Sequence, residues 1–181
     1  MALEIGNSAV DFKLKGVDGK EYALASFADR KALAIVFSCN HCPYVEAYED
    51  RMIQIHKQFE PKGFTLVAIN SNEDKNYPQD SFENMVIRAK DKGFPFPYLR
   101  DETQRVARAY GAVRTPHVFL LDEKRNLRYQ GAIDDNWEHP DKLKKPYLIW
   151  AIEALLAGKL PPQAETLPVG CSIKWRANEK K

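Results

Sequence analysis

Two apolar runs separated by an amphipathic stretch dominate the first half of this chain. Residues 32–37 (ALAIVF) and 64–69 (FTLVAI) are almost wholly apolar, which indicates central strands buried on both faces. Between them, apolar side chains recur every three or four residues, as on one face of a helix: Val45, Tyr48, Met52, Ile55 and Phe59. The pattern therefore predicts a strand–helix–strand unit whose strands are parallel and whose crossover is right-handed.

Shorter patterns flank this unit. Residues 11–14 and 21–24 alternate around the turn 17–19 (VDG) and predict an N-terminal hairpin. Turn and capping residues further along delimit helices at 81–93, 102–110 and 147–156, and strands at 98–100, 118–121 and 127–130. No shift in composition marks a second domain, so we predict one domain over residues 1–181, with 158–181 as an extended C-terminal tail.

Composition narrows the function classes. The 181 residues are 44% hydrophobic and carry a formal net charge of +2. No basic stripe with interleaved aromatic side chains is present, which argues against nucleic-acid binding. No segment approaches the roughly 18 apolar residues of a membrane span, and the N-terminus lacks a signal-peptide pattern. We therefore expect a cytoplasmic protein without a membrane partner. In that compartment, closely spaced cysteines are more often catalytic or metal-binding than structural.

Two of the three cysteines, Cys39 and Cys42, form a C-x-x-C pair between the first buried strand and the long helix. If Cys39 capped the helix, Pro43 would fall in its first turns and delete a regular hydrogen bond. If Cys42 caps it, Pro43 takes the first helical position, where proline is favoured. A cap position lowers the pKa of a thiol, so the sequence favours Cys42 as the thiolate and places Cys39 in the preceding loop.

With these elements, the chain resembles the thioredoxin-like superfamily, in the redoxin branch that includes the AhpC/TSA family. The resemblance covers roughly residues 5–157 and rests on the N-terminal hairpin, the C-x-x-C strand–helix junction, and Arg114-Thr115-Pro116 before the strand that follows. It implies a three-layer α/β sandwich, with a central mixed sheet, helices on both faces and the hairpin as an extension. It also implies that Pro116 is cis and lies, with Thr115, beside the reactive cysteine.

The motif departs from both better-known patterns of this superfamily. Val45 stands where thioredoxins have their second cysteine, and Cys39 stands where peroxiredoxins have a threonine. The arginine that helps peroxiredoxins bind peroxide is not evident. The 22 residues from Cys42 to Phe64 do match the family's usual distance from its first cysteine to the next strand.

The leading hypothesis is a thiol–disulfide oxidoreductase with Cys39 and Cys42 as the redox pair and no bound cofactor. One alternative is a peroxiredoxin-like peroxidase using Cys42, resolved by Cys39 or Cys171. Another is a non-catalytic copper or zinc carrier that uses both cysteines and a histidine. The substrates would be protein or small-molecule disulfides or thiols, or peroxides, and a thiol protein would supply electrons to a monomer or homodimer.

Three further residues are candidates for the site. His41, next to Cys42, would stabilise the thiolate if it were cationic, although a loop histidine can equally face solvent. Glu46 in the first helical turn complements the helix dipole, and a proton-shuttle role is the less favoured interpretation. Cys171 lies in the tail, where it either packs as a small hydrophobic residue or folds back to resolve an oxidised Cys42.

Overall fold

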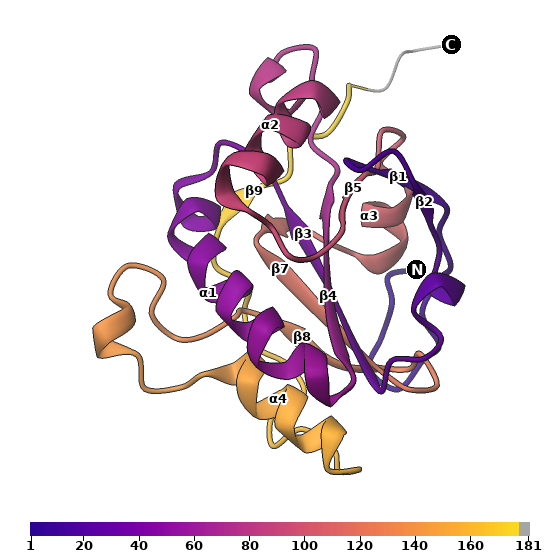
Figure 1. Ribbon diagram of the computed structural model, residues 1–181, viewed down its shortest axis with the longest axis vertical. Coiled ribbons are helices and arrows are strands. Elements are labelled where there is room, and N and C mark those ends of the chain that lie inside the picture. The colour runs from indigo at the N-terminus through magenta and orange to yellow at the C-terminus, as the bar shows by residue number, and fades with distance from the viewer. Residues whose placement is uncertain (178–181) are drawn as a thin grey trace.

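A computed structural model describes residues 1–177 and contains a seven-stranded sheet, a separate two-stranded sheet and four α-helices (Figure 1). The helices are α1 (Pro43–Phe59), α2 (Phe82–Lys92), α3 (Arg105–Tyr110) and α4 (Tyr147–Leu156). The strands are β1 (Leu14–Gly16), β2 (Glu21–Tyr22), β3 (Ala32–Ser38), β4 (Phe64–Asn70), β5 (Tyr98–Arg100), β6 (Arg114–Thr115), β7 (His117–Asp122), β8 (Leu127–Gly131) and β9 (Cys171–Ser172).

The order of strands in the main sheet is β2-β1-β5-β4-β3-β7-β8. Strand β3 lies near the middle, pairs in parallel with β4 across α1, and pairs antiparallel with β7. The predicted parallel strand–helix–strand unit is thus confirmed. Strands β6 and β9 form the second sheet and bring together two segments that are far apart in the chain.

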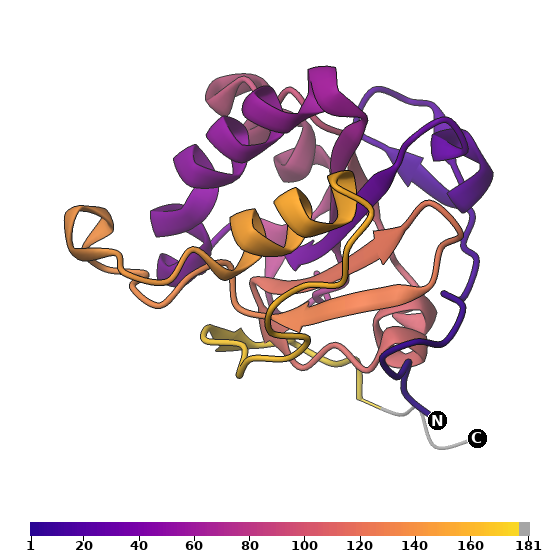
Figure 2. The same ribbon diagram turned by 90° about the horizontal axis from the view of Figure 1, so that it is seen from below.

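Helices cover both faces of the main sheet, as Figures 1 and 2 show. Along β3, Ala32, Ala34 and Val36 pack into a core formed with α1, α2 and α4. The alternate side chains of β3 pack into a second core with α3 and the N-terminal segment. The alternation follows from the two-residue period of a strand, so an apolar run such as 32–37 fills both cores at once. The predicted three-layer mixed α/β sandwich is confirmed.

The structure corrects several predicted boundaries. The N-terminal hairpin is shorter than expected, because the Asp11 carboxylate accepts the backbone N–H groups of Phe12 (2.8 Å) and Leu24 (3.0 Å) instead of leaving them to a strand. The predicted helix 102–110 begins only at Arg105, since Gln104 adopts a left-handed conformation (φ 60°). Strands β6 and β9 were not predicted at all. Residues 178–181 of the predicted tail lie outside the described residues.

No helix within residues 1–177 combines the length and the apolar character needed to cross a bilayer.

Candidate active site

Cys42 is the N-cap residue of α1. Its backbone is extended (φ −93°, ψ 125°), Pro43 takes the first helical position, and the Cys42 carbonyl accepts the first helical hydrogen bond from Glu46 N (2.9 Å). Cys39 lies in the short loop between β3 and α1. The helix start predicted from Pro43 is therefore confirmed.

Three free cysteines meet at this helix start. Cys39 and Cys42 form a small apolar cluster with Val45, and Cys171 from the tail packs against it. Cys39 and Cys42 are 3% and 1% exposed, whereas Cys171 is only partly buried. The structure thus brings together the predicted pair and the third cysteine, which are far apart in the sequence.

Thr115 contacts both members of the pair. Its hydroxyl oxygen lies 3.4 Å from Cys39 Sγ, and its carbonyl oxygen lies 3.4 Å from Cys42 Sγ. The following peptide bond, Thr115–Pro116, is cis, as the resemblance implies. The contact between Cys42 Sγ and the carbonyl is a hydrogen bond only while the thiol keeps its proton, so it opposes ionisation of Cys42. Thr115 therefore lies at the cysteine pair, and Pro116 follows it directly through the cis peptide bond.

The three thiols differ strongly in acidity. A hydrogen bond from the Cys39 thiol is the largest cause that lowers the pKa of Cys42, to about 4, against the opposing effect of burial. The Cys171 thiol and the backbone N–H groups of Val45 and Cys171 lower it further. The same interaction with Cys42, together with burial and the Asp80 charge, raises the pKa of Cys39 well above its usual range. Burial and the interaction with Cys42 raise the pKa of Cys171 to about 11. Cys42 is therefore the most acidic of the three thiols and the one that is ionised at neutral pH.

We predict that the ultraviolet absorbance of the Cys42 thiolate, taken as the difference between the wild-type protein and Cys42→Ser, persists from neutral pH down to about pH 5. It should fall by half near pH 4, because the native fold lowers the pKa of Cys42 to about 4. In Cys39→Ala the midpoint should rise, since this variant removes the thiol whose hydrogen bond contributes most to the low pKa of Cys42. A wild-type midpoint near the ordinary thiol value of about 8.5 would show that the cysteine cluster does not stabilise the Cys42 thiolate.

His41 lies beside Asp80. Its Nδ1 atom is 2.6 Å from Asp80 Oδ2, and its ring stacks on Tyr77 with 5.8 Å between ring centroids. The histidine is thus only partly exposed, and one of its ring nitrogens lies within 4.8 Å of Cys39 Sγ, but the electrostatic role predicted for it at Cys42 stays a prediction. An ion pair with Asp80 would hold the loop between the two cysteines in place.

Asp80 is a site residue that sequence reasoning placed only in a polar loop. Its side chain is fully buried. Oδ1 accepts hydrogen bonds from the backbone N–H of Asn40 (2.7 Å) and from Asn70 Nδ2 (3.0 Å), and Oδ2 accepts one from Asn72 Nδ2 (2.9 Å). The sequence signal that could have indicated this network is the polar run Asn-Ser-Asn at residues 70–72, directly after the predicted buried strand. Asp80 therefore fixes the backbone between Cys39 and Cys42.

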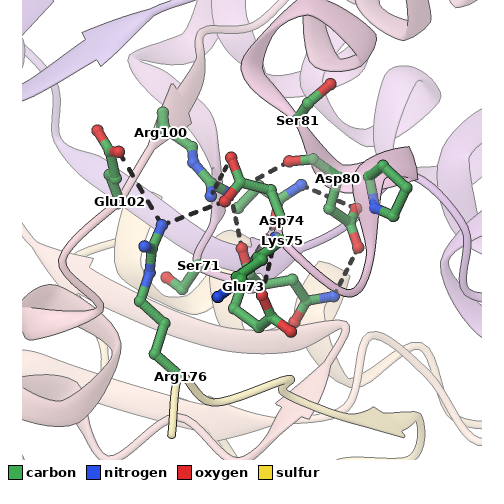
Figure 3. Close-up of polar contacts among 12 residues, drawn as sticks. Ser71, Glu73, Asp74, Lys75, Asp80, Ser81, Arg100, Glu102 and Arg176 are labelled. Carbon is green, nitrogen blue, oxygen red and sulfur yellow. Dashed lines mark hydrogen bonds and ion pairs between the residues drawn. The ribbon is translucent and has the colours of Figure 1, made fainter. Parts of the chain in front are cut away.

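An arginine holds the loop that carries Asp80. Arg100, at the end of β5, donates to the carbonyl oxygens of Asn72 (2.8 Å) and Asp80 (3.2 Å) and lies 3.4 Å from Asp74 Oδ2 (Figure 3). The other carboxylate oxygen of Asp74 lies 3.2 Å from Arg176 in the tail. Asp74 thus links the buried Arg100 to Arg176 of the C-terminal tail, the same tail that carries Cys171.

Glu46 lies in the first turn of α1 with its side chain half exposed. Its carboxylate is 4.0 Å from Arg88 of α2, a weak contact across the surface. This position suits an interaction with the helix dipole and gives no contact with a thiol, so a proton-shuttle role stays a prediction.

Comparisons with known proteins agree with this geometry. A model of the AhpC/TSA family matches residues 5–130. The thiol-disulfide oxidoreductase ResA of Geobacillus thermodenitrificans is 26% identical over 127 residues, which are 70% of this chain and 68% of that protein.

Two solved structures are similar over almost their whole length. A hypothetical protein from Sinorhizobium meliloti is 35% identical, with a TM-score of 0.92 and 98% of each chain covered. A conserved protein from Geobacillus kaustophilus is 39% identical, with a TM-score of 0.91, covering 96% of this chain and 93% of its own. The thioredoxin domain of a thiol-disulfide oxidoreductase from Bacteroides vulgatus has a TM-score of 0.59 at 17% identity, covering 70% of this chain and 86% of its own. That likeness shows the thioredoxin-like fold alone.

Proposed function

This chain belongs to the AhpC/TSA family, and on that premise we propose that it is a thiol–disulfide oxidoreductase whose redox pair is Cys39 and Cys42. The observation that carries the proposal is the position of Cys42 at the cap of α1, with Cys39 as its neighbour in a shared, buried cluster. A relative named thiol-disulfide oxidoreductase supports the reaction class.

The order of steps follows from the different pKa values of Cys42 and Cys39. The Cys42 thiolate attacks one sulfur of a substrate disulfide, forms a mixed disulfide and releases the other sulfur as a thiolate. Cys42 then carries no charge, so the interaction that most raises the pKa of Cys39 is lost. Cys39 gives up its proton, attacks Cys42 Sγ and releases the second substrate thiol, and the protein is left with a Cys39–Cys42 disulfide. The low pKa of Cys42 also makes it a good leaving group when a partner reduces that disulfide.

The partners in this reaction are a disulfide of a protein or small molecule and a thiol protein that restores the two thiols. A cytoplasmic location fits such a reducing partner and forms part of the proposal.

Mild oxidation with a diazene thiol oxidant should produce an intramolecular Cys39–Cys42 disulfide. Both cysteines lie in one tryptic peptide, residues 32–51, so the bond appears in mass spectrometry as that peptide lighter by two hydrogens. Cys171→Ser is the matched control and should form the same bond. Two thiols that stay open to alkylation after oxidation would rule out this redox pair.

A peroxidase is the second candidate, because Cys42 followed by Pro43 opens the helix as in peroxiredoxins. Sulfur and backbone groups, rather than an arginine, are the main causes that lower the pKa of Cys42, which gives this candidate less support. Rapid peroxide consumption that survives Cys39→Ser but not Cys42→Ser would favour it over the disulfide reaction.

A metal carrier is the third candidate, since ligand atoms of Cys39, His41 and Asp80 lie within 4.8 Å of one another. This trio differs from the two cysteines and a histidine expected from the sequence. Both Asp80 oxygens already accept hydrogen bonds from asparagines or backbone, so a metal would have to displace those donors. Stoichiometric Zn²⁺ binding that protects Cys39 from alkylation would favour the carrier.

A further inference from the structure

We propose that Cys171 is a third redox-active thiol, which exchanges with Cys39 as the disulfide partner of Cys42. The inference rests on the proposed function, in which Cys42 is the nucleophile and forms a disulfide with Cys39. The inference goes beyond the proposed function because it makes the C-terminal tail part of the reaction. It also connects the buried cysteine pair to the surface.

Strand pairing sets Cys171 opposite the site. Strand β9 runs antiparallel to β6, and in this register Cys171 faces Thr115. Directly opposed residues in an antiparallel pair have Cα atoms about 4.5–5.5 Å apart. The Thr115 carbonyl is the group 3.4 Å from Cys42 Sγ, and the Cys171 thiol packs on the Cys39–Cys42 cluster. Figure 1 shows β9 passing beside the start of α1.

The residue before Cys171 allows this close approach. A Cβ atom added at Gly170 would overlap the Thr115 carbonyl and crowd the Pro116 nitrogen at 3.2 Å. Only a residue without a side chain lets the tail lie against the Thr115–Pro116 peptide in this way. The tail therefore packs directly against the Thr115–Pro116 peptide at the site.

The tail is also held on both sides of β9. Upstream, Thr166 N donates to Gln130 O (3.0 Å), which fixes the tail along β8. Downstream, the Lys174 carbonyl accepts hydrogen bonds from Glu73 N and Gln104 Nε2, each 2.8 Å long, and Gln104 Oε1 accepts from Arg176 N (2.8 Å).

Arg176 pairs with Asp74 (3.2 Å) beyond these backbone contacts (Figure 3). Gln104 reaches both of its tail partners from a left-handed backbone conformation, which costs free energy in a residue other than glycine. Cys171 is thus a fixed part of the site, held at the cluster by contacts that the rest of the tail makes.

The exposure of Cys171 indicates its role in the reaction. Cys42 is 1% exposed and Cys39 3%, whereas Cys171 is partly exposed, so a bulky partner meets Cys171 before the pair. In the exchange, the Cys171 thiolate attacks Cys42 Sγ of the Cys39–Cys42 disulfide. A Cys42–Cys171 bond forms, the Cys39–Cys42 bond breaks, and its electron pair stays on Cys39. Cys39 takes up a proton equal to the one Cys171 lost, so no outside oxidant is needed.

The test uses tryptic peptides of the full chain after mild oxidation with the same diazene oxidant. Cys171 lies in the peptide 160–174, so a Cys42–Cys171 bond joins it to the peptide 32–51. We expect the Cys39→Ser monomer, isolated on a non-reducing gel, to contain mainly this linked pair, and partly oxidised wild-type protein to contain both disulfides. A Cys171 that stays open to alkylation in both oxidised proteins would overturn the proposal.

Two variants test whether the position of β9 is what allows Cys42 and Cys171 to form a disulfide. Gly170→Ala should slow formation of the linked pair at least about tenfold, because the added methyl group moves β9 from Thr115 and lowers the effective concentration of the two thiols. Arg176→Ala should slow it less. Both variants should keep the Cys39–Cys42 bond, and an unchanged rate in Gly170→Ala would contradict the role of β9. Failure of the Cys39–Cys42 bond in Cys171→Ser would instead count against the proposed function.

Discussion

Cys42→Ser should lose disulfide reductase activity by about 10³-fold or more, the scale seen when an enzyme loses its nucleophile. Cys42 is the one thiol of the three whose pKa the fold lowers, to about 4, while the pKa values of Cys39 and Cys171 are raised. In the variant, burial and, for Cys39, the Asp80 charge still raise the pKa of the two remaining thiols, so at neutral pH they hold little thiolate. The measurement is the rate of reduction of a small aromatic disulfide under a regenerating thiol, with circular dichroism to confirm the fold.

Cys39→Ser is the matched variant for this experiment. It keeps the attacking thiolate and removes the resolving thiol, so a mixed disulfide between Cys42 and the substrate should accumulate and appear as added mass. Cys39→Ser,Cys171→Ser should accumulate more of it, because neither neighbour can then release the substrate. Activity that survives Cys42→Ser but is lost in Cys39→Ser would show that Cys39, and not Cys42, is the nucleophile.

Asp80→Ala should destabilise the reduced protein by about 3–5 kcal/mol, because several buried neutral donors lose a shared acceptor. The substitution leaves the buried N–H donors of Asn40 and Asn72 without an acceptor and Asn70 Nδ2 with only the Tyr98 hydroxyl at 3.4 Å, and each unsatisfied group costs about 1–3 kcal/mol. Urea unfolding of the reduced protein measures the change in the free energy of unfolding.

The controls for Asp80→Ala are a conservative and a remote substitution. Asp80→Asn keeps one acceptor oxygen and should cost less. Asp91→Ala, at an exposed position of α2, should stay within about 0.5 kcal/mol. Because the Asp80 charge helps to raise the pKa of Cys39, that pKa should fall in both Asp80 variants. Unchanged stability and unchanged Cys39 titration in Asp80→Ala would show that the network does not support the site.

Local signals predicted the nucleophile's position well. Proline is favoured at the first position of a helix, and the apolar runs 32–37 and 64–69 are typical of buried strands, so local patterns alone place Cys42 at the cap. The same reasoning failed at 11–14, because the Asp11 carboxylate competes for backbone N–H groups at a distance of thirteen residues. Hydrophobic period carries no information on such side-chain acceptors.

The sequence by itself determined the layered α/β fold, the pairing of a strand end with a helix start, and the cysteine that occupies the cap. The strand–helix–strand unit and the cap follow from hydrophobic period and proline stereochemistry, which act between residues close in the chain, and the three layers were implied by the resemblance to the thioredoxin-like superfamily. Only the tertiary structure decided that Cys171 faces Thr115 and that Asp80 binds the loop between Cys39 and Cys42. Those contacts join distant segments through β9 pairing and buried polar networks, whose partners no local pattern specifies.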